Sequence, residues 1–349
     1  MSNIAVLTSG GDAPGMNAAV MAVARNAAYL GMPLIGIKRG YNGLLGKGKK
    51  FEDDFIRLDL DTVLDIADLP GTYLRTARCD EFKDPAVREK AAQILRDLDI
   101  SGLVVIGGDG SFQGAMRLCE LGIPCIGIPG TIDNDLPYTE VTLGYDTATN
   151  VCVDAVRAIR ATSRSHDRPH IVEVMGRNCG DLALATAEAT GAEIVIVPEA
   201  DWCVDDIANR LNHQISIGNT RATIVVAEGC WASMAPFDVY EFLHPYGKQV
   251  FPGEPMTSNR LASVLKRKCG MAEVRSTVVG YTQRGCSPTA RDSMFAFEAG
   301  SMAVQLLRKG ISNQAIGVEN GRTFHMPMDK ALAAKRNFNR RLYNLINAL

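Results

Sequence analysis

The sequence lacks an excess of charge of either sign. Its 349 residues carry 37 Lys and Arg against 39 Asp and Glu, which gives a formal net charge of −2. No overall positive field therefore marks the chain for nucleic acid or for an anionic membrane surface. A site for an anion must be built locally, from a few side chains and backbone N–H groups.

Long apolar runs and a basic leader are also missing. No apolar stretch approaches 18 residues, and MSNIAVLTSGGDAPG enters a strand-like run at once. We therefore expect a cytoplasmic protein that uses neither a membrane nor a nucleic acid as partner. The nine cysteines show no C-x-x-C spacing, which favours reduced thiols over a disulfide framework or a zinc site.

Short β-branched runs alternate with longer stretches of helical period. The strands IAVLTS, GLVVIG and CIGIPG are followed by helices over 16–30, over 112–121 and up to Ser165. A second series consists of HIVEVMG, DLALATAEAT, AEIVIVP, DDIANRLNHQI and RATIVVAEG. This pattern predicts an α/β fold with two lobes, each a mainly parallel sheet flanked by helices with Rossmann-like topology.

The later part of the chain is less regular. Residues 231–256 are rich in Pro, Gly and aromatics without a clear period, which predicts a loop or insertion. Helices are expected over 261–268 and 287–309, with a strand in EVRSTVVGYTQRG between them. No 20–50 residue repeat and no low-complexity tract is present.

Two glycine loops share one design, in which a buried strand ends in glycines and a helix begins at once. They are Gly10, Gly11 and Asp12 in the first loop, and Gly107, Gly108, Asp109, Gly110 and Ser111 in the second. Glycine lets phosphate oxygens approach backbone N–H groups, and the helix start adds donors. Asp109 is the candidate ligand for Mg²⁺ carried on a nucleotide. Two ordinary turns with a capping Asp remain the alternative.

The third strand ends in GIPGTIDNDLPYTE, which places Thr131, Asp133 and Asp135 at the same edge. One aspartate there can accept the proton of an attacking hydroxyl while the other orients a partner or the metal. We assign Asp133 as the base. An Asp-rich turn that caps a helix is the alternative.

The ordered motifs SGGDAPGMNA, GGDGS, PGTIDND, EVMGR and QRG-x-SP resemble those of the phosphofructokinase family, and the resemblance spans nearly the whole chain. It implies ATP-dependent phosphorylation of fructose 6-phosphate by a homotetramer, with Mg²⁺ and ATP on one lobe and the sugar phosphate in the cleft. It further implies a nucleotide lobe over 1–144 plus 284–334 and a sugar-phosphate lobe over 145–283 plus 335–349.

The resemblance also implies roles for individual residues. Nucleotide would be held by Gly11, Tyr41, Arg78, Cys79, Gly108, Asp109, Gly110 and Ser111. The sugar would meet Thr131, Asp133, Asp135, Met175, Gly176, Arg177 and Glu228, and its 6-phosphate would be clamped by Arg168, Arg275 and Arg284 from two subunits. Thr131, Asp133, Asp135, Arg177 and Gly11 form the catalytic set. For any single arginine a surface salt bridge is the alternative.

The family divides by phosphoryl donor. Pyrophosphate users typically carry an aspartate after GGD and a lysine before TIDND, and this sequence has Gly110 and Gly130 there. A carboxylate at the first position would repel an α-phosphate, so ATP is the expected donor. A pyrophosphate-dependent enzyme is the alternative.

Several positions depart from the family pattern. Tyr281 replaces the usual histidine before QRG, and Arg75 stands where a small residue is expected. Tyr281, together with the insertion over 231–256, leaves a related ketose phosphate such as sedoheptulose 7-phosphate as an alternative acceptor.

The residues that serve allosteric effectors in bacterial members are only partly present. Arg25, Arg160 and Glu193 remain, whereas Met21 replaces an expected arginine, so weak or altered effector control is expected.

Two further functions stay as alternatives. A catalytically silent nucleotide sensor would not need the acids that are present. A dinucleotide-dependent oxidoreductase would need the missing GxGxxG fingerprint.

Overall fold

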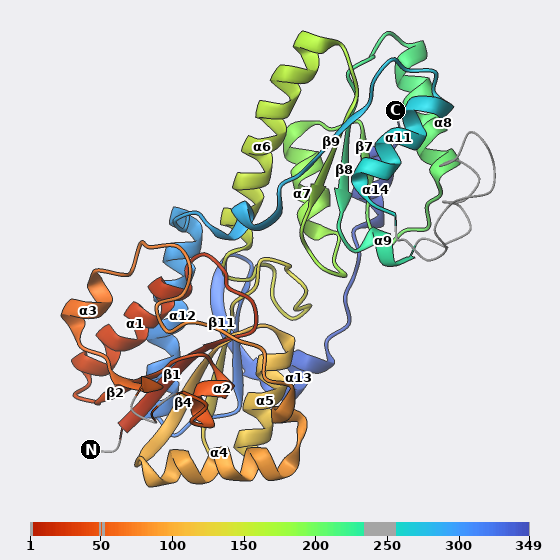
Figure 1. Ribbon diagram of the computed structural model, residues 1–349. Coiled ribbons are helices and arrows are strands. Elements are labelled where there is room, and N and C mark those ends of the chain that lie inside the picture. Colours follow the sequence, from red (N-terminus) through yellow and green to blue (C-terminus); the bar gives the residue numbers. More distant parts are fainter. Residues whose placement is uncertain (1–2, 49, 51–52, 234–255, 349) are drawn as a thin grey trace. The chain divides into compact units, whose positions relative to one another are not determined.

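The computed structural model describes residues 3–48, 50, 53–233 and 256–348 (Figure 1). Most of the insertion predicted over 231–256 therefore lies outside the described residues. The chain divides into two compact units. Unit 1 consists of Met1–Ala148 and Arg284–Arg336, and unit 2 consists of Thr149–Gln283 and Asn337–Leu349.

Unit 1 is built on a seven-stranded sheet with the order β11-β10-β5-β4-β1-β2-β3. Its strands are β1 (Asn3–Ser9), β2 (Leu34–Ile37), β3 (Phe55–Arg57), β4 (Ile100–Gly107), β5 (Cys125–Pro129), β10 (Gln314–Glu319) and β11 (Arg322–Pro327). The central strands are parallel, and only the edge strands β3 and β11 pair antiparallel among the described residues. The ends of β1, β4 and β5 are in register, because Ser9 lies opposite Gly107 and Gly107 opposite Pro129.

Helices flank this sheet. They are α1 (Met16–Tyr29), α2 (Tyr41–Leu44), α3 (Leu60–Leu64), η2 (Asp80–Lys83), α4 (Pro85–Asp97), α5 (Asp109–Glu120), α12 (Ala290–Arg308) and α13 (Met328–Ala333). Helices α1 and α12 lie side by side although they are far apart in the sequence (Figure 1). Gly300 permits this close packing, since a Cβ there would lie 2.6 Å from the Ala22 side chain. The long helix α6 (Tyr145–His166) starts in unit 1 and continues into unit 2.

Unit 2 contains a four-stranded parallel sheet with the order β7-β8-β6-β9. Its strands are β6 (His170–Val174), β7 (Ile194–Ile196), β8 (Thr223–Ala227) and β9 (Arg275–Val278). The accompanying helices are α7 (Asp181–Thr190), α8 (Val204–Ser216), α9 (Cys230–Ser233), α11 (Ser258–Lys268) and α14 (Arg340–Ile346), and η3 (Gly280–Arg284) ends at the boundary with unit 1. The predicted α/β class with two parallel-rich sheets is confirmed.

Two predicted helix starts shift for local reasons. Helix α5 begins at Asp109 rather than at 112, because Gly108 is its N-cap and Asp109 already belongs to the first turn. Helix α12 begins at Ala290 rather than at 287, because the Thr289 hydroxyl caps it by accepting from the Asp292 N–H. Among the described residues no helix is long and apolar enough to span a bilayer.

The first turns of α6 and α12 cap each other within unit 1. The buried Asp292 carboxylate accepts from the N–H groups of Gly144 (2.9 Å) and Thr147 (2.8 Å) and from the Thr147 hydroxyl (2.5 Å). In return, the Thr147 hydroxyl accepts from the Thr289 N–H over 2.9 Å, and the Thr289 hydroxyl donates to the Asp146 carboxylate over 2.7 Å. Both helix starts thereby satisfy orphan donors that would otherwise be buried without a partner.

Candidate active site

The three strand ends of unit 1 bring their loops together at one edge of the sheet. The Gly130 N–H donates to the Gly107 carbonyl over 3.0 Å, which ties the third loop to the second. Gly107 has no room for a side chain, since a Cβ there would lie 2.5 Å from both the Ser9 carbonyl oxygen and the Ser111 hydroxyl oxygen. The glycines therefore allow three loops to meet at a spacing that larger residues would prevent.

Asp109 lies at the start of α5, where exposed N–H groups and the helix dipole favour an anion. Its side chain is exposed, and one carboxylate oxygen accepts from the Gln113 side chain over 2.6 Å. No group of three or more His, Cys, Asp or Glu among the described residues is arranged to hold a metal by itself. This donor set fits Mg²⁺ that arrives on phosphates, because such an ion needs only one or two protein carboxylates.

The third loop carries Thr131, Asp133 and Asp135 on a rigid backbone. Thr142 fixes it by donating its hydroxyl to the Thr131 carbonyl (2.7 Å) and its N–H to the Asn134 side chain (3.1 Å). Asn134 has a left-handed φ of 51°, and the Thr131 hydroxyl accepts from the Asp133 N–H over 3.2 Å. Thr131, Asp133 and Asp135 are all half-buried, so each keeps part of its surface accessible at the strand edge.

Arg284, predicted to bind the 6-phosphate together with Arg168 and Arg275, lies against the first glycine loop. Arg284 belongs to unit 1, and its guanidinium lies 3.4 Å from the Asp12 carboxylate. A Cβ at Gly11 would come within 3.3 Å of the same guanidinium. The structure thus places this positive charge over the first glycine loop.

Tyr41 packs against the second glycine loop through its ring and its hydroxyl. It is buried, it stacks on Phe82 with ring centroids 4.1 Å apart, and its hydroxyl donates to the Ser111 carbonyl over 2.6 Å. Burial raises the pKa of the phenol well above its ordinary value, so the hydroxyl stays a donor. The ring therefore holds the loop in place and leaves little surface for a ligand, whereas Arg78 is exposed and Cys79 is half-buried.

At the carboxyl end of β6 in unit 2, Met175, Gly176 and Arg177 form a tight turn. Arg177 has a φ of 52°, and its N–H donates to the Glu228 carboxylate over 2.9 Å. The buried Gln283 accepts from the Met175 N–H over 3.1 Å. Sequence reasoning chose only the arginine of the QRG motif and missed Gln283, which organises this turn.

At the amino end of the same sheet, Arg168 and Arg275 share the carboxylate of Glu273. Behind them, the buried His170 contacts the Thr277 hydroxyl over 2.8 Å. The two predicted sets of sugar contacts in unit 2 thus lie at opposite ends of β6, which is five residues, or about 16 Å, long. Tyr281, in η3, is 78% exposed.

The residues that the resemblance assigns to an effector site already contact other side chains or backbone groups of this chain. Arg160 pairs with Glu193 over 2.9 Å and also donates to the Thr190 carbonyl. Glu193 further accepts from the Thr223 N–H over 2.8 Å, and Arg25 lies over the Phe297 ring at 5.6 Å.

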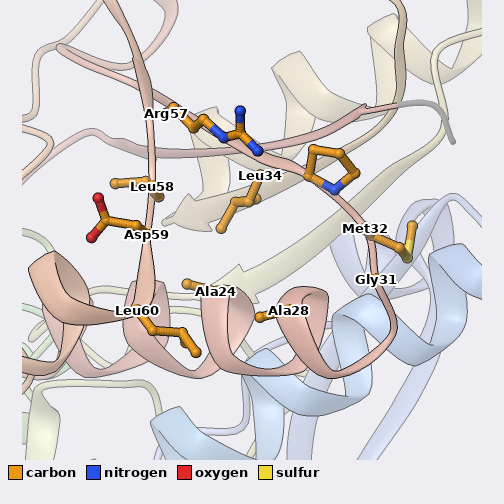
Figure 2. Close-up of a pocket in the computed structure, with 10 residues that line it drawn as sticks. Ala24, Ala28, Gly31, Met32, Leu34, Arg57, Leu58, Asp59 and Leu60 are labelled. Carbon is orange, nitrogen blue, oxygen red and sulfur yellow. The ribbon is translucent and has the colours of Figure 1, made fainter.

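A pocket of about 270 Å³ lies at the end of α1, against β2 and the segment after β3 (Figure 2). Its lining is mostly apolar, with Arg57 as its cation. The Asp59 carboxylate in this lining already caps α3 by accepting from the Thr62 N–H. An apolar pocket with this single positive charge is poorly suited to a polyphosphate.

Comparison with known proteins finds relatives over the full length of this chain. The family model described as phosphofructokinase matches residues 3–307. The ATP-dependent 6-phosphofructokinase 1 of Clostridium perfringens is 46% identical over 100% of this chain and 99% of its own length. That of Clostridium botulinum strain Hall is 45% identical with the same coverage.

Solved structures show the same fold. Phosphofructokinase from Saccharomyces cerevisiae aligns with a TM-score of 0.79 and 32% identity, covering 95% of this chain and 45% of the yeast chain. That from Pichia pastoris gives 0.82 and 30%, covering 95% of this chain and 37% of its own. The chain described here belongs to the phosphofructokinase family.

Proposed function

We propose that the protein is a cytoplasmic, glycolytic 6-phosphofructokinase that transfers the γ-phosphoryl group of ATP to the 1-hydroxyl of fructose 6-phosphate. The observation that carries this proposal is the meeting of three loops, two rich in glycine and one rich in aspartate, at the carboxyl edge of β1, β4 and β5. Full-length similarity to relatives named as ATP-dependent 6-phosphofructokinases supports it.

Each loop has a separate task in this reaction. The first two loops bind phosphates through backbone N–H groups, with Ser111 and the start of α5 as further donors. Asp133 accepts the proton of the attacking hydroxyl, while Thr131 and Asp135 hold the third loop and the sugar. When bound, Mg²⁺ neutralises phosphate charge, and Asp109 is its protein ligand. Arg284 over Gly11 adds positive charge at the first loop.

Unit 2 supplies contacts to the sugar phosphate. Met175, Gly176, Arg177 and Glu228 at one end of β6 suit hydroxyl groups, and Arg168 with Arg275 at the other end suits the 6-phosphate. One hexose phosphate is too short to reach both ends of this strand. A site that takes its arginine pair from a second copy resolves this mismatch, and we propose a homotetramer on that basis.

The surroundings of two glycines support ATP over pyrophosphate. A Cβ at Gly110 meets nothing within 4 Å, so this position opens onto space that an α-phosphate can fill. Gly130, in contrast, is enclosed, since a Cβ there would lie 2.8 Å from the Met16 side chain. A lysine at 130 would require Met16 to move.

Initial rates test this function directly. With saturating Mg²⁺, ATP and fructose 6-phosphate should give the highest rate, compared with pyrophosphate as donor and sedoheptulose 7-phosphate as acceptor. A preference for pyrophosphate would refute the donor assignment, and turnover of the larger sugar alone would refute the acceptor. ADP and phosphoenolpyruvate belong in the same assay, where we expect weak or altered effects because Met21 replaces an expected arginine. Strong regulation by either compound would contradict that expectation.

A further inference from the structure

Glu273 forms ion pairs with the two arginines that are proposed to bind the 6-phosphate. Its Oε2 pairs with Nη1 of Arg168, and its Oε1 pairs with Nη2 of Arg275. One carboxylate therefore presents one oxygen to each guanidinium, which is the contact that phosphate oxygens would make. Both arginines, and Arg168 in the first place, lower the pKa of Glu273, so the carboxylate is ionised wherever the enzyme works.

Arg168, Glu273 and Arg275 form a charged triad, and backbone pairing holds its members close together. The Arg275 N–H donates to the Pro169 carbonyl over 3.2 Å, which fixes the start of β9 beside the residue that follows Arg168. Glu273 lies two residues before Arg275, directly ahead of β9, and its two carboxylate oxygens pair with the two guanidinium groups. The pairing of β6 with β9 therefore brings the three charged side chains close together.

The triad has spare capacity for a ligand. Arg168 is 19% exposed, Glu273 35% and Arg275 58%, so a solute can reach all three. The Nε of Arg168 is buried and has no hydrogen-bond partner among the described residues. Two guanidinium groups and one carboxylate leave a net charge of +1, which would be +2 without Glu273.

We propose that Glu273 is a built-in competing anion, which occupies Arg168 and Arg275 in the empty site and is displaced when the phosphate group of the sugar binds. This inference rests on the proposed role of the two arginines. Glu273 weakens binding of every phosphate by a similar factor, and inorganic phosphate has no sugar contacts to offset that loss. Glu273 thereby sets the affinity for phosphate groups without touching the reacting atoms.

Calorimetric titration of the nucleotide-free protein tests the proposal with two probes, fructose 6-phosphate and inorganic phosphate. Glu273→Gln should bind both about three- to tenfold more tightly, as expected for removal of two partly exposed ion pairs. KM for fructose 6-phosphate should fall with kcat unchanged, and the gain should shrink at high ionic strength. Glu273→Ala, which removes the hydrogen bonds as well, should show the same direction.

Glu120→Gln is the matched control, because Glu120 pairs with Arg117 on the exposed face of α5 and should leave both affinities unchanged. Unchanged or weaker phosphate binding by Glu273→Gln would overturn the inference and identify Glu273 as a support for the arginines. Arg275→Gln separates this from the proposed function. If Arg275→Gln leaves binding of fructose 6-phosphate intact, the assignment of the phosphate site itself fails.

Discussion

At the scale of single residues, Asp133 carries the chemistry of the proposed reaction. Asp133→Asn removes the proton acceptor but keeps the size of the side chain and its backbone contact with Thr131. We expect kcat to fall by ~10²–10⁴-fold while the dissociation constants of both substrates stay within about threefold. Steady-state rates and calorimetry measure the two quantities, and near-normal turnover would rule out Asp133 as the base.

A second prediction concerns Gly110, where we expect an added charge to weaken binding of an α-phosphate. Gly110→Asp fits sterically, because a Cβ meets nothing within 4 Å, yet it places a negative charge at the start of α5. We expect KM for MgATP to rise by roughly tenfold, which corresponds to about 1.4 kcal/mol of repulsion. Gly110→Asn, of equal size and no charge, is the control. Equal KM values for the two variants would show that space rather than charge governs this position.

Residue types and spacing were enough to predict that the glycine loops and the aspartate loop meet at one sheet edge, and the roles of these residues stay predictions. The same reasoning could not predict Gln283 or Glu273. Each acts through a partner more than 100 residues away in the sequence, Met175 for Gln283 and Arg168 for Glu273. Tyr41 was expected beside the nucleotide, and its burial under Ser111 depends on packing that a motif does not encode.

At the scale of elements, the mutual cap of α6 and α12 should contribute strongly to stability. Asp292→Ala leaves two N–H groups and one hydroxyl without their acceptor in a buried place. We expect the free energy of unfolding to fall by roughly 3 kcal/mol, with a smaller loss for Asp292→Asn. Urea denaturation measures both. Asp154→Ala, on the exposed surface of α6, should cost under about 0.5 kcal/mol.

His170 should make the pairing of β6 and β9 sensitive to acid. Burial first, and then the charges of Arg168 and Arg275, lower the pKa of His170 from 6.5 to about 4. Between these pH values the unfolded chain binds a proton that the folded chain does not, so stability falls as the pH falls from 6.5 to 4. The loss should approach roughly 3 kcal/mol at the acidic end.

Urea denaturation across this pH range tests the effect. His170→Gln should flatten the dependence, because glutamine does not titrate. His213→Gln should leave it unchanged, since His213 is exposed on α8. A slope that is identical in the wild type and in His170→Gln would assign the acid sensitivity to other groups.

Periodicity predicted the long elements best. The helix expected over DLALATAEAT agrees with α7 at both ends, because an acidic first turn and Gly191 after the last turn mark its limits. The short strands β2 and β3, with four and three residues, escaped prediction. Runs of this length carry too little alternation, and only pairing fixes them as strands, of β2 with β1 and of β3 with β2.

At the scale of the whole molecule, sharing of sites between copies can be tested by complementation. Asp133→Asn and Arg275→Gln should each be poorly active alone. A hybrid oligomer with both variants should regain activity, because some of its sites combine an intact Asp133 from one copy with an intact Arg275 from another. Co-expression with two affinity tags isolates the hybrid. If it stays as inactive as its parents, each site is formed by one chain.

The two-unit α/β architecture followed from the order of strands and helices along the chain. That order could not show that α12, β10 and β11 complete the first unit. Residues 284–336 return to unit 1 after unit 2 has been built, and their place depends on contacts such as that of Gly300 with α1.

This interrupted order has a consequence during synthesis on the ribosome. Strands β1, β4 and β5 and helix α1 emerge early, but α12, which covers one face of α1, follows only after the whole of residues 149–283. Until then the apolar face of α1 is open to other nascent chains and to chaperones. At that stage unit 2 already has the four strands of its sheet but still lacks residues 337–349, so neither unit is complete until the end of the chain has emerged.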